Sequence, residues 1–119
     1  MPDLALYHND ACSKCRATAA LLAERGLQPR VVEYLLTPPD DATLRDLVGK
    51  LAIPARELLR KGEPEYAGLG LDDPTLPDDI AIAAMVAQPR LIERPILVRG
   101  ERAVICRPPE RALELVDGA

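Results

Sequence analysis

A short apolar run followed at once by two cysteines is the feature that most constrains what this chain can fold into. The stretch HNDACSKCR follows the apolar run LALY (residues 4–7) and holds Cys12 and Cys15 in a C-x-x-C spacing. Helix-forming residues then continue to Gly26, which predicts a helix that begins at Cys12 and stops at the glycine. The segment RVVEYL (residues 30–35), with two adjacent valines, predicts a second strand. The chain is therefore predicted to open as β-α-β, with the cysteines where strand becomes helix.

The middle of the chain is predicted to be helical. Two prolines end the second strand, and Asp40 or Asp41 can then cap a helix whose apolar residues follow a helical spacing. Residues 78–88 are apolar nearly all round, which predicts a well-buried helix. We therefore expect residues 40–90 to form a mainly helical insertion.

The last third of the chain predicts a hairpin and a closing helix. Residues 94–98 and 102–107 read as two antiparallel strands around a turn at Gly100, and a helix follows the proline pair at 108–109. The predicted order is β-α-β, helices, then β-β-α, which is an α/β fold with a mixed sheet. At 119 residues the chain has the size of one domain, so we expect a single domain over 1–119.

The composition of the chain argues against several classes of protein. The net charge is −4 and the pI about 5.0, which argues against a surface that wraps nucleic acid. No window approaches the ~18 apolar residues of a membrane span, and the start of the chain does not resemble a signal peptide. Three cysteines, an odd number, argue against a disulfide-stapled scaffold. We expect a cytoplasmic protein with neither nucleic acid nor membrane as a partner.

Cys12 is placed where thiol chemistry is expected. The first turn of a helix presents unpaired backbone N–H groups and the positive end of the helix dipole, so it favours a thiolate and also binds anions. Lys14 and Arg16 add positive charge nearby. His8, four residues earlier and the one histidine in the chain, is a candidate to orient the thiolate.

The other cysteines allow several interpretations. A structural zinc site needs about four N or S ligands, and one C-x-x-C, one distant Cys106 and one histidine do not supply a convincing set, so we expect no metal. Cys106 lies in an apolar strand, which favours a structural role. Cys15 can either attack a mixed disulfide on Cys12 or face the core as a spectator, and the sequence leaves both open. The C-x-x-C in its β-α-β context favours a thioredoxin-like redox fold.

Motifs along nearly the whole chain carry a family resemblance. They are LYHNDAC (residues 6–12), YLLTPP (34–39), LLRK (58–61), RPILV (94–98) and CRP (106–108), and they occur in family order. With them the sequence resembles the glutaredoxin-coupled arsenate reductases, which have a thioredoxin-like fold with a helical insertion.

The resemblance implies a role for each matching residue. It implies that Cys12 is the nucleophile, that His8 is the histidine preceding it, and that Arg60, Arg94 and Arg107 bind the oxyanion. In that family the thiolate attacks arsenate, glutathione reduces the adduct, and glutaredoxin clears the mixed disulfide as arsenite is released. No bound cofactor is implied, and glutathione is expected as co-substrate. A thioredoxin-like fold also implies a cis proline opposite the redox cysteine, for which Pro95 is the candidate.

Cys15 departs from the family pattern. The arsenate reductases of this type lack a second cysteine at this spacing, so an internal disulfide with a thioredoxin-like protein as recipient is an alternative route. A related branch of the fold uses C-x-x-C as a redox switch and binds RNA polymerase, which gives a regulator as an alternative function. A general dithiol-disulfide oxidoreductase is the third hypothesis.

Overall fold

The computed structural model describes residues 4–9 and 11–116, and these form two compact units. One unit combines the residues up to Thr37 with those from Arg94 onward, and the other spans Pro38 to Glu93. Each unit is described by itself below. The assignment of residues 1–119 to one domain with an insertion over 40–90 stays a prediction.

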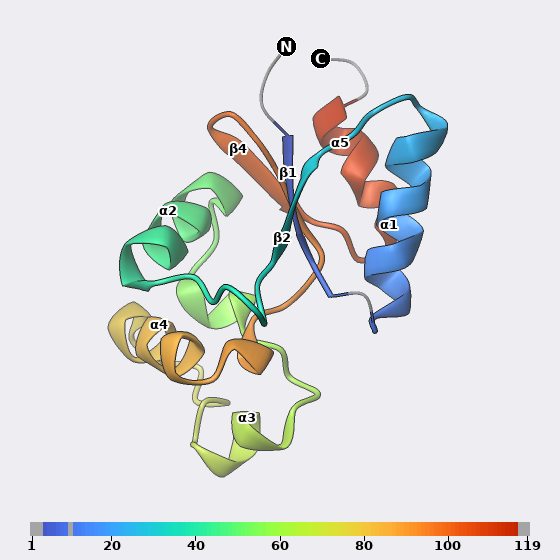
Figure 1. The fold of residues 1–119 in the computed structure, drawn as a ribbon. Coiled ribbons are helices and arrows are strands. Elements are labelled where there is room, and N and C mark those ends of the chain that lie inside the picture. Colours follow the sequence, from blue (N-terminus) through green and yellow to red (C-terminus); the bar gives the residue numbers. More distant parts are fainter. Residues whose placement is uncertain (1–3, 10, 117–119) are drawn as a thin grey trace. The chain divides into compact units, whose positions relative to one another are not determined.

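The first unit is built on a four-stranded mixed sheet in the order β2-β1-β3-β4 (Figure 1). Its central pair β1 and β3 run antiparallel, β4 is antiparallel to β3, and β2 is parallel to β1. The helix α1 (Ser13–Glu24) forms the crossover between the parallel strands. The strand bounds are β1 Leu4–His8, β2 Arg30–Glu33, β3 Ile96–Arg99 and β4 Arg102–Ile105. The predicted β-α-β opening and closing hairpin are confirmed.

Two glycines fit the turns for which they were predicted. Gly26 follows the end of α1 with φ of 73°, and Gly100 joins β3 to β4 with φ of 59°. A side chain with a Cβ rarely adopts this left-handed conformation, so glycine is the natural residue at both turns.

Both outer strands are shorter than predicted. The strand β2 ends at Glu33 because the chain turns there, and the carbonyl of Glu33 accepts the N–H groups of Leu36 and Thr37. The strand β4 ends at Ile105, and the residues after it form the turn that enters the site described below.

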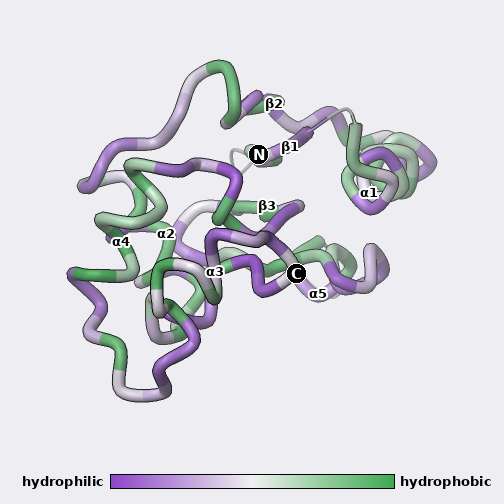
Figure 2. The backbone as a smooth tube through the Cα atoms, turned by 90° about the horizontal axis from the view of Figure 1, so that it is seen from below, coloured by the Kyte–Doolittle hydropathy of each residue, from purple (hydrophilic) through white to green (hydrophobic). Residues whose placement is uncertain are grey.

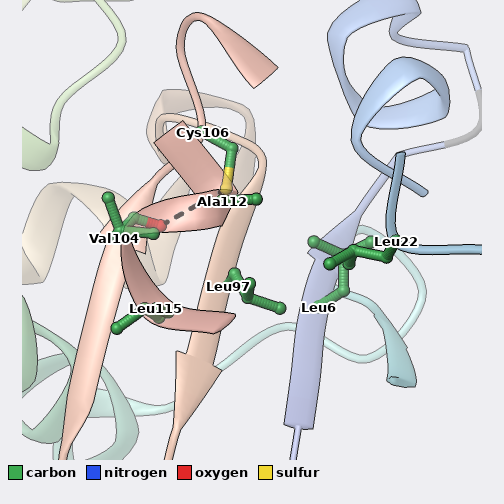
Figure 3. Close-up of a cluster of buried hydrophobic side chains, with 7 residues drawn as sticks. All are labelled: Leu6, Leu22, Leu97, Val104, Cys106, Ala112 and Leu115. Carbon is green, nitrogen blue, oxygen red and sulfur yellow. Dashed lines mark hydrogen bonds between the residues drawn. The ribbon is translucent and has the colours of Figure 1, made fainter. Parts of the chain in front are cut away.

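The core of this unit lies on the face of the sheet that α1 and α5 (Leu113–Val116) cover (Figure 1). Leu6 pairs in register with Leu97, and Leu97 with Val104, so the three side chains form a row on one face. Figure 3 shows this row meeting Leu22 of α1 and Leu115 of α5. The strand β3 is apolar along most of its length in Figure 2, as suits a strand inside the sheet.

The second unit is helical. It contains α2 (Asp41–Leu51), η1 (Ala55–Leu58), α3 (Pro64–Gly68), α4 (Asp78–Ala87) and η2 (Pro89–Leu91), where η marks a 3₁₀ helix. Asp40 caps α2, as predicted, because its Oδ1 accepts the Thr43 N–H at 2.8 Å. The buried face of α2 carries Leu44 and Leu47.

The prediction that residues 78–88 form a helix buried nearly all round was wrong for one face. The helix α4 packs on η1, η2 and α2 through Ala81, Ile82 and Met85. Ile80 is 52% exposed and Val86 40% exposed. An apolar composition therefore overstated the burial, because the neighbours of α4 within its unit cover one side of it. Among the residues that the structure describes, no helix has the length and apolar character needed to cross a membrane.

Candidate active site

Cys12 occupies the N-cap of α1, directly after the turn that follows β1. Asn9 organises this turn, because its Oδ1 accepts the Ala11 N–H at 3.0 Å and its carbonyl accepts the Cys12 N–H at 2.9 Å. An N-cap side chain points at the free N–H groups of the first helical turn. Here the backbone N–H groups of Lys14 and Cys15 act to stabilise a negative charge on the Cys12 sulfur and so lower its pKa. The sulfur is thus held where a negative charge is stabilised.

The pKa of the Cys12 thiol lies below its ordinary value of 9.0. Burial acts to raise it, and the thiol is only 9% exposed. The hydrogen bonds from the backbone and thiol of Cys15 and from the backbone of Lys14, together with the positive charge of Arg94, act to lower it and outweigh the burial. Cys12 is therefore the thiol poised to react as a thiolate.

Two arginines lie at this thiol. Nη2 of Arg107 donates to Sγ of Cys12 at 3.6 Å, and Nε of the same side chain donates to the carbonyl of Arg94 at 2.6 Å. Both arginines are half-buried. Arg107 thereby joins the segment before β3 to the start of α1. The result is a thiolate site that carries two guanidinium groups, the chemistry that binds and neutralises an oxyanion.

Two cis peptide bonds and one backbone hydrogen bond lie beside these arginines. The Arg94–Pro95 and Arg107–Pro108 peptide bonds are both cis. The Pro95 carbonyl accepts the Cys106 N–H at 2.8 Å, which continues the pairing of β3 and β4 past the ends of the strands. Pro95 itself is buried.

Cys15 lies one helical turn along from Cys12 and is fully buried. Burial is the main cause that raises the pKa of Cys15 to about 12, while the Asn9 backbone lowers it. The neighbouring Cys12 also raises it, because its sulfur accepts the Cys15 S–H and carries negative charge. Cys15 therefore stays protonated beside the Cys12 thiolate.

The remaining candidates in this unit are His8 and Cys106. His8 is 6% exposed at the end of β1, opposite Glu33 in register, and shares the sheet face of Leu6. Cys106 is fully buried in the cluster of Figure 3, where its thiol contacts the Val104 carbonyl at 3.8 Å. Burial raises the pKa of Cys106 to about 12. These contacts agree with the structural role predicted for Cys106.

Arg60 belongs to the other compact unit. Its Nε lies 3.4 Å from Oε1 of Glu63, and its Nη1 lies 3.5 Å from Oε1 of Glu93. Its backbone N–H donates to the Leu91 carbonyl at 2.6 Å. The side chain is thus half-buried between two carboxylates, and its role toward an oxyanion stays a prediction.

Two features of the site were not identified from the sequence. Asn9 builds the turn before Cys12, and the sequence signal for it is an Asn three residues before a helix cap. The bond from Arg107 to the Arg94 carbonyl has no sequence signal, because 13 positions separate the two residues. Within residues 4–9 and 11–116 no cluster of three or more His, Cys, Asp or Glu side chains is arranged to hold a metal ion.

The comparison with known proteins decides the family. Residues 7–115 match the ArsC family. The chain belongs to the ArsC family. The match spans β1 to α5, so it includes Cys12, Cys15 and all three arginines.

Relatives of this ArsC family protein align with it over almost their whole length. Escherichia coli YfgD, described as an uncharacterized protein, is 52% identical and covers 93% of this chain and 94% of its own. An arsenate reductase of Neisseria meningitidis serogroup A is 43% identical and covers 92% of this chain and 95% of its own. The solved arsenate reductase of Vibrio cholerae has a TM-score of 0.90 at 43% identity and covers 95% of this chain and 97% of its own. The predicted thioredoxin-like α/β fold is confirmed.

Proposed function

We propose that this protein reduces arsenate to arsenite with the Cys12 thiolate as nucleophile. One observation carries the proposal: the thiol with the lowered pKa lies at a helix start and is contacted by Arg107. Relatives named arsenate reductases support the choice of substrate.

The arginines offset the main physical obstacle to this reaction, which is the repulsion between two negative charges. Arsenate at neutral pH is an anion that a thiolate repels, so attack needs positive charge at the site. Arg94 and Arg107 supply this charge beside Cys12, and we propose that Arg60 adds to it. The N–H groups at the start of α1 extend the same anion site. The thiolate then displaces an arsenate oxygen, which leaves as water, and a sulfur–arsenic bond forms.

We propose glutathione as the thiol co-substrate, with glutaredoxin or a thioredoxin-like protein restoring the enzyme. Attack by the glutathione thiol on the Cys12 sulfur forms a mixed disulfide and breaks the sulfur–arsenic bond. The electron pair of that bond stays on arsenic, which is thereby reduced to arsenite. No bound cofactor takes part in these steps. A pool of glutathione is typical of the cytoplasm, where we place the protein. His8 is proposed to orient the thiolate from the end of β1.

The test is arsenate-dependent consumption of NADPH in an assay coupled through glutathione, glutaredoxin and glutathione reductase. We expect turnover for the wild-type protein and none for Cys12→Ser. The exposed residue Arg102 on β4 provides a matched control, because Arg102→Ala removes an arginine away from the site. Absence of turnover in the wild-type protein with any thiol donor would overturn the proposal.

A further inference from the structure

We propose that Cys15 is the resolving thiol of this protein, which attacks the Cys12 sulfur after it has bonded to arsenic and leaves a Cys12–Cys15 disulfide. A dithiol protein of the thioredoxin class then reduces this disulfide by thiol–disulfide exchange. The inference rests on the proposed function, because it needs the arsenic adduct on Cys12. It changes the electron donor from glutathione to a protein dithiol.

The geometry places the second thiol against the first. Cys12 is the N-cap of α1 and Cys15 is the third residue of that helix, so the two thiols belong to the same helical turn. Side chains three residues apart on a helix lie about 5–6 Å apart at Cβ, whereas a disulfide needs about 3.5–4.5 Å. Cys12 has the extended backbone of an N-cap and not a helical one, so an adjustment of this residue can close the difference. Both thiols are free in this structure, so they are available for the reaction.

Cys106, the third thiol, is a poor candidate for this step. It is fully buried in the core cluster with Leu97 and Leu115, and its S–H is directed to the Val104 carbonyl. Cys15, by contrast, lies in the same helical turn as the nucleophile. Burial also keeps Cys15 away from external oxidants and thiols, which leaves the Cys12 sulfur as its nearest reaction partner.

The environment of Cys15 also favours its attack on Cys12 only after Cys12 has attacked arsenate. Before reaction its pKa is raised by burial and, in addition, by the charge and hydrogen bond of the Cys12 thiolate. Once the Cys12 sulfur is bonded to arsenic it no longer carries that charge. The lowering influences of the Asn9 backbone and the Arg94 charge remain. Cys15 therefore becomes easier to ionise when its attack is needed.

The step balances in atoms and electrons. The Cys15 sulfur attacks the Cys12 sulfur, a sulfur–sulfur bond forms, and the sulfur–arsenic bond breaks. The electron pair of that bond stays on arsenic, which goes from As(V) to As(III) and leaves as arsenite. The Cys15 proton passes to solvent or to an arsenite oxygen. Each of the two cysteines has given up one electron, and the dithiol protein later returns both.

A single-turnover experiment without added thiol tests the inference. Fully reduced protein is freed of reductant and mixed with arsenate, arsenite is quantified, and the protein is analysed by intact mass and by peptide mapping. We expect one arsenite per chain, the loss of two hydrogens from the protein mass, and a Cys12–Cys15 disulfide. Afterwards thioredoxin with its reductase should restore the thiols.

Three variants separate the resolving role from a structural one. Cys15→Ser keeps a hydroxyl that can donate to the Cys12 thiolate but cannot form a disulfide, and we expect arsenite release to fall to the background of Cys12→Ser. Cys15→Ala checks the result without a buried hydroxyl. Cys106→Ala removes a thiol outside the site and should release arsenite as the wild type does. Circular dichroism and thermal melting confirm that each variant is folded.

The outcomes distinguish this inference from the proposed function. If wild type turns over with glutathione but releases no arsenite without it, the resolving role of Cys15 is overturned and the proposed function stands. If Cys15→Ser releases one arsenite per chain as fast as wild type without added thiol, the inference is likewise overturned. If wild type yields no arsenite with glutathione or with thioredoxin, both fail.

Discussion

The contact between Arg107 and Cys12 gives the most direct prediction about reactivity. Arg107→Ala removes the Nη2 donor that lies 3.6 Å from Sγ and the Nε donor that holds the Arg94 carbonyl. A hydrogen bond to a charged group contributes about 1.5–3 kcal/mol, and we take the lower part of this range because the bond is long and half-buried. The ratio of thiolate to thiol at Cys12 should then fall about 10-fold or somewhat more. The pKa of Cys12 should accordingly rise.

The assay is the pH dependence of alkylation by iodoacetamide. Burial and local contacts hold the pKa values of Cys15 and Cys106 near 12, so at neutral pH Cys12 should be the thiol that reacts. Wild-type alkylation should reach half its maximum below the ordinary thiol pKa, and the curve of Arg107→Ala should move to higher pH. Arg107→Lys keeps the charge and should lie between the two.

Arg102→Ala is the control, because it removes one positive charge from an exposed position on β4. Its alkylation curve should coincide with that of the wild type. The reasoning is refuted if folded Arg107→Ala reacts with the wild-type pH profile, because the guanidinium would then contribute nothing to the thiolate.

The remaining predictions concern stability and the second unit. Asp40→Ala should lower the melting temperature, whereas Asp40→Asn keeps the helix cap. The Thr43 backbone lowers the pKa of Asp40, so the higher stability of the wild type over Asp40→Ala should disappear in calorimetry when the pH is lowered through that pKa. Leu6→Ala should cost about 2–5 kcal/mol of unfolding free energy in urea, whereas Leu36→Ala, at a side chain 82% exposed, should change it by about 0.5 kcal/mol or less; equal effects would contradict the assigned core. Arg60→Ala should lower kcat/KM for arsenate about 10- to 100-fold, while exposed Lys61→Ala should leave it nearly unchanged; similar kinetics for the two variants would remove Arg60 from the oxyanion site.

Local sequence signals correctly predicted the turns and the helix start that depend on a single residue. Gly26 and Gly100 marked turns that need a positive φ, and Asp40 marked a helix start. The lengths of the outer strands were overestimated, because Tyr34 and Leu35 continue the apolar run of β2 although the chain already turns at Glu33. The exposed face of α4 was missed, because an apolar sequence does not say how many neighbours a helix has.

The site was predictable in part. The placement of Cys12 followed from the change of period between strand and helix, which is a local signal. The approach of Arg107 to Cys12 joins residues 95 positions apart, and only the family resemblance pointed to it. The interaction between Cys15 and Cys12 depends on side-chain rotamers in the first turn of α1, which spacing alone left open.

Direct quantification of arsenite with Cys12→Ser beside wild type tests the central claim most directly. Both proteins are incubated with arsenate and with either glutathione plus glutaredoxin or thioredoxin plus its reductase, and arsenite is separated and measured. The account predicts continuous arsenite formation by the wild type with at least one donor system and none above background by Cys12→Ser. Equal arsenite from both proteins, or none from the wild type with either donor, would contradict it.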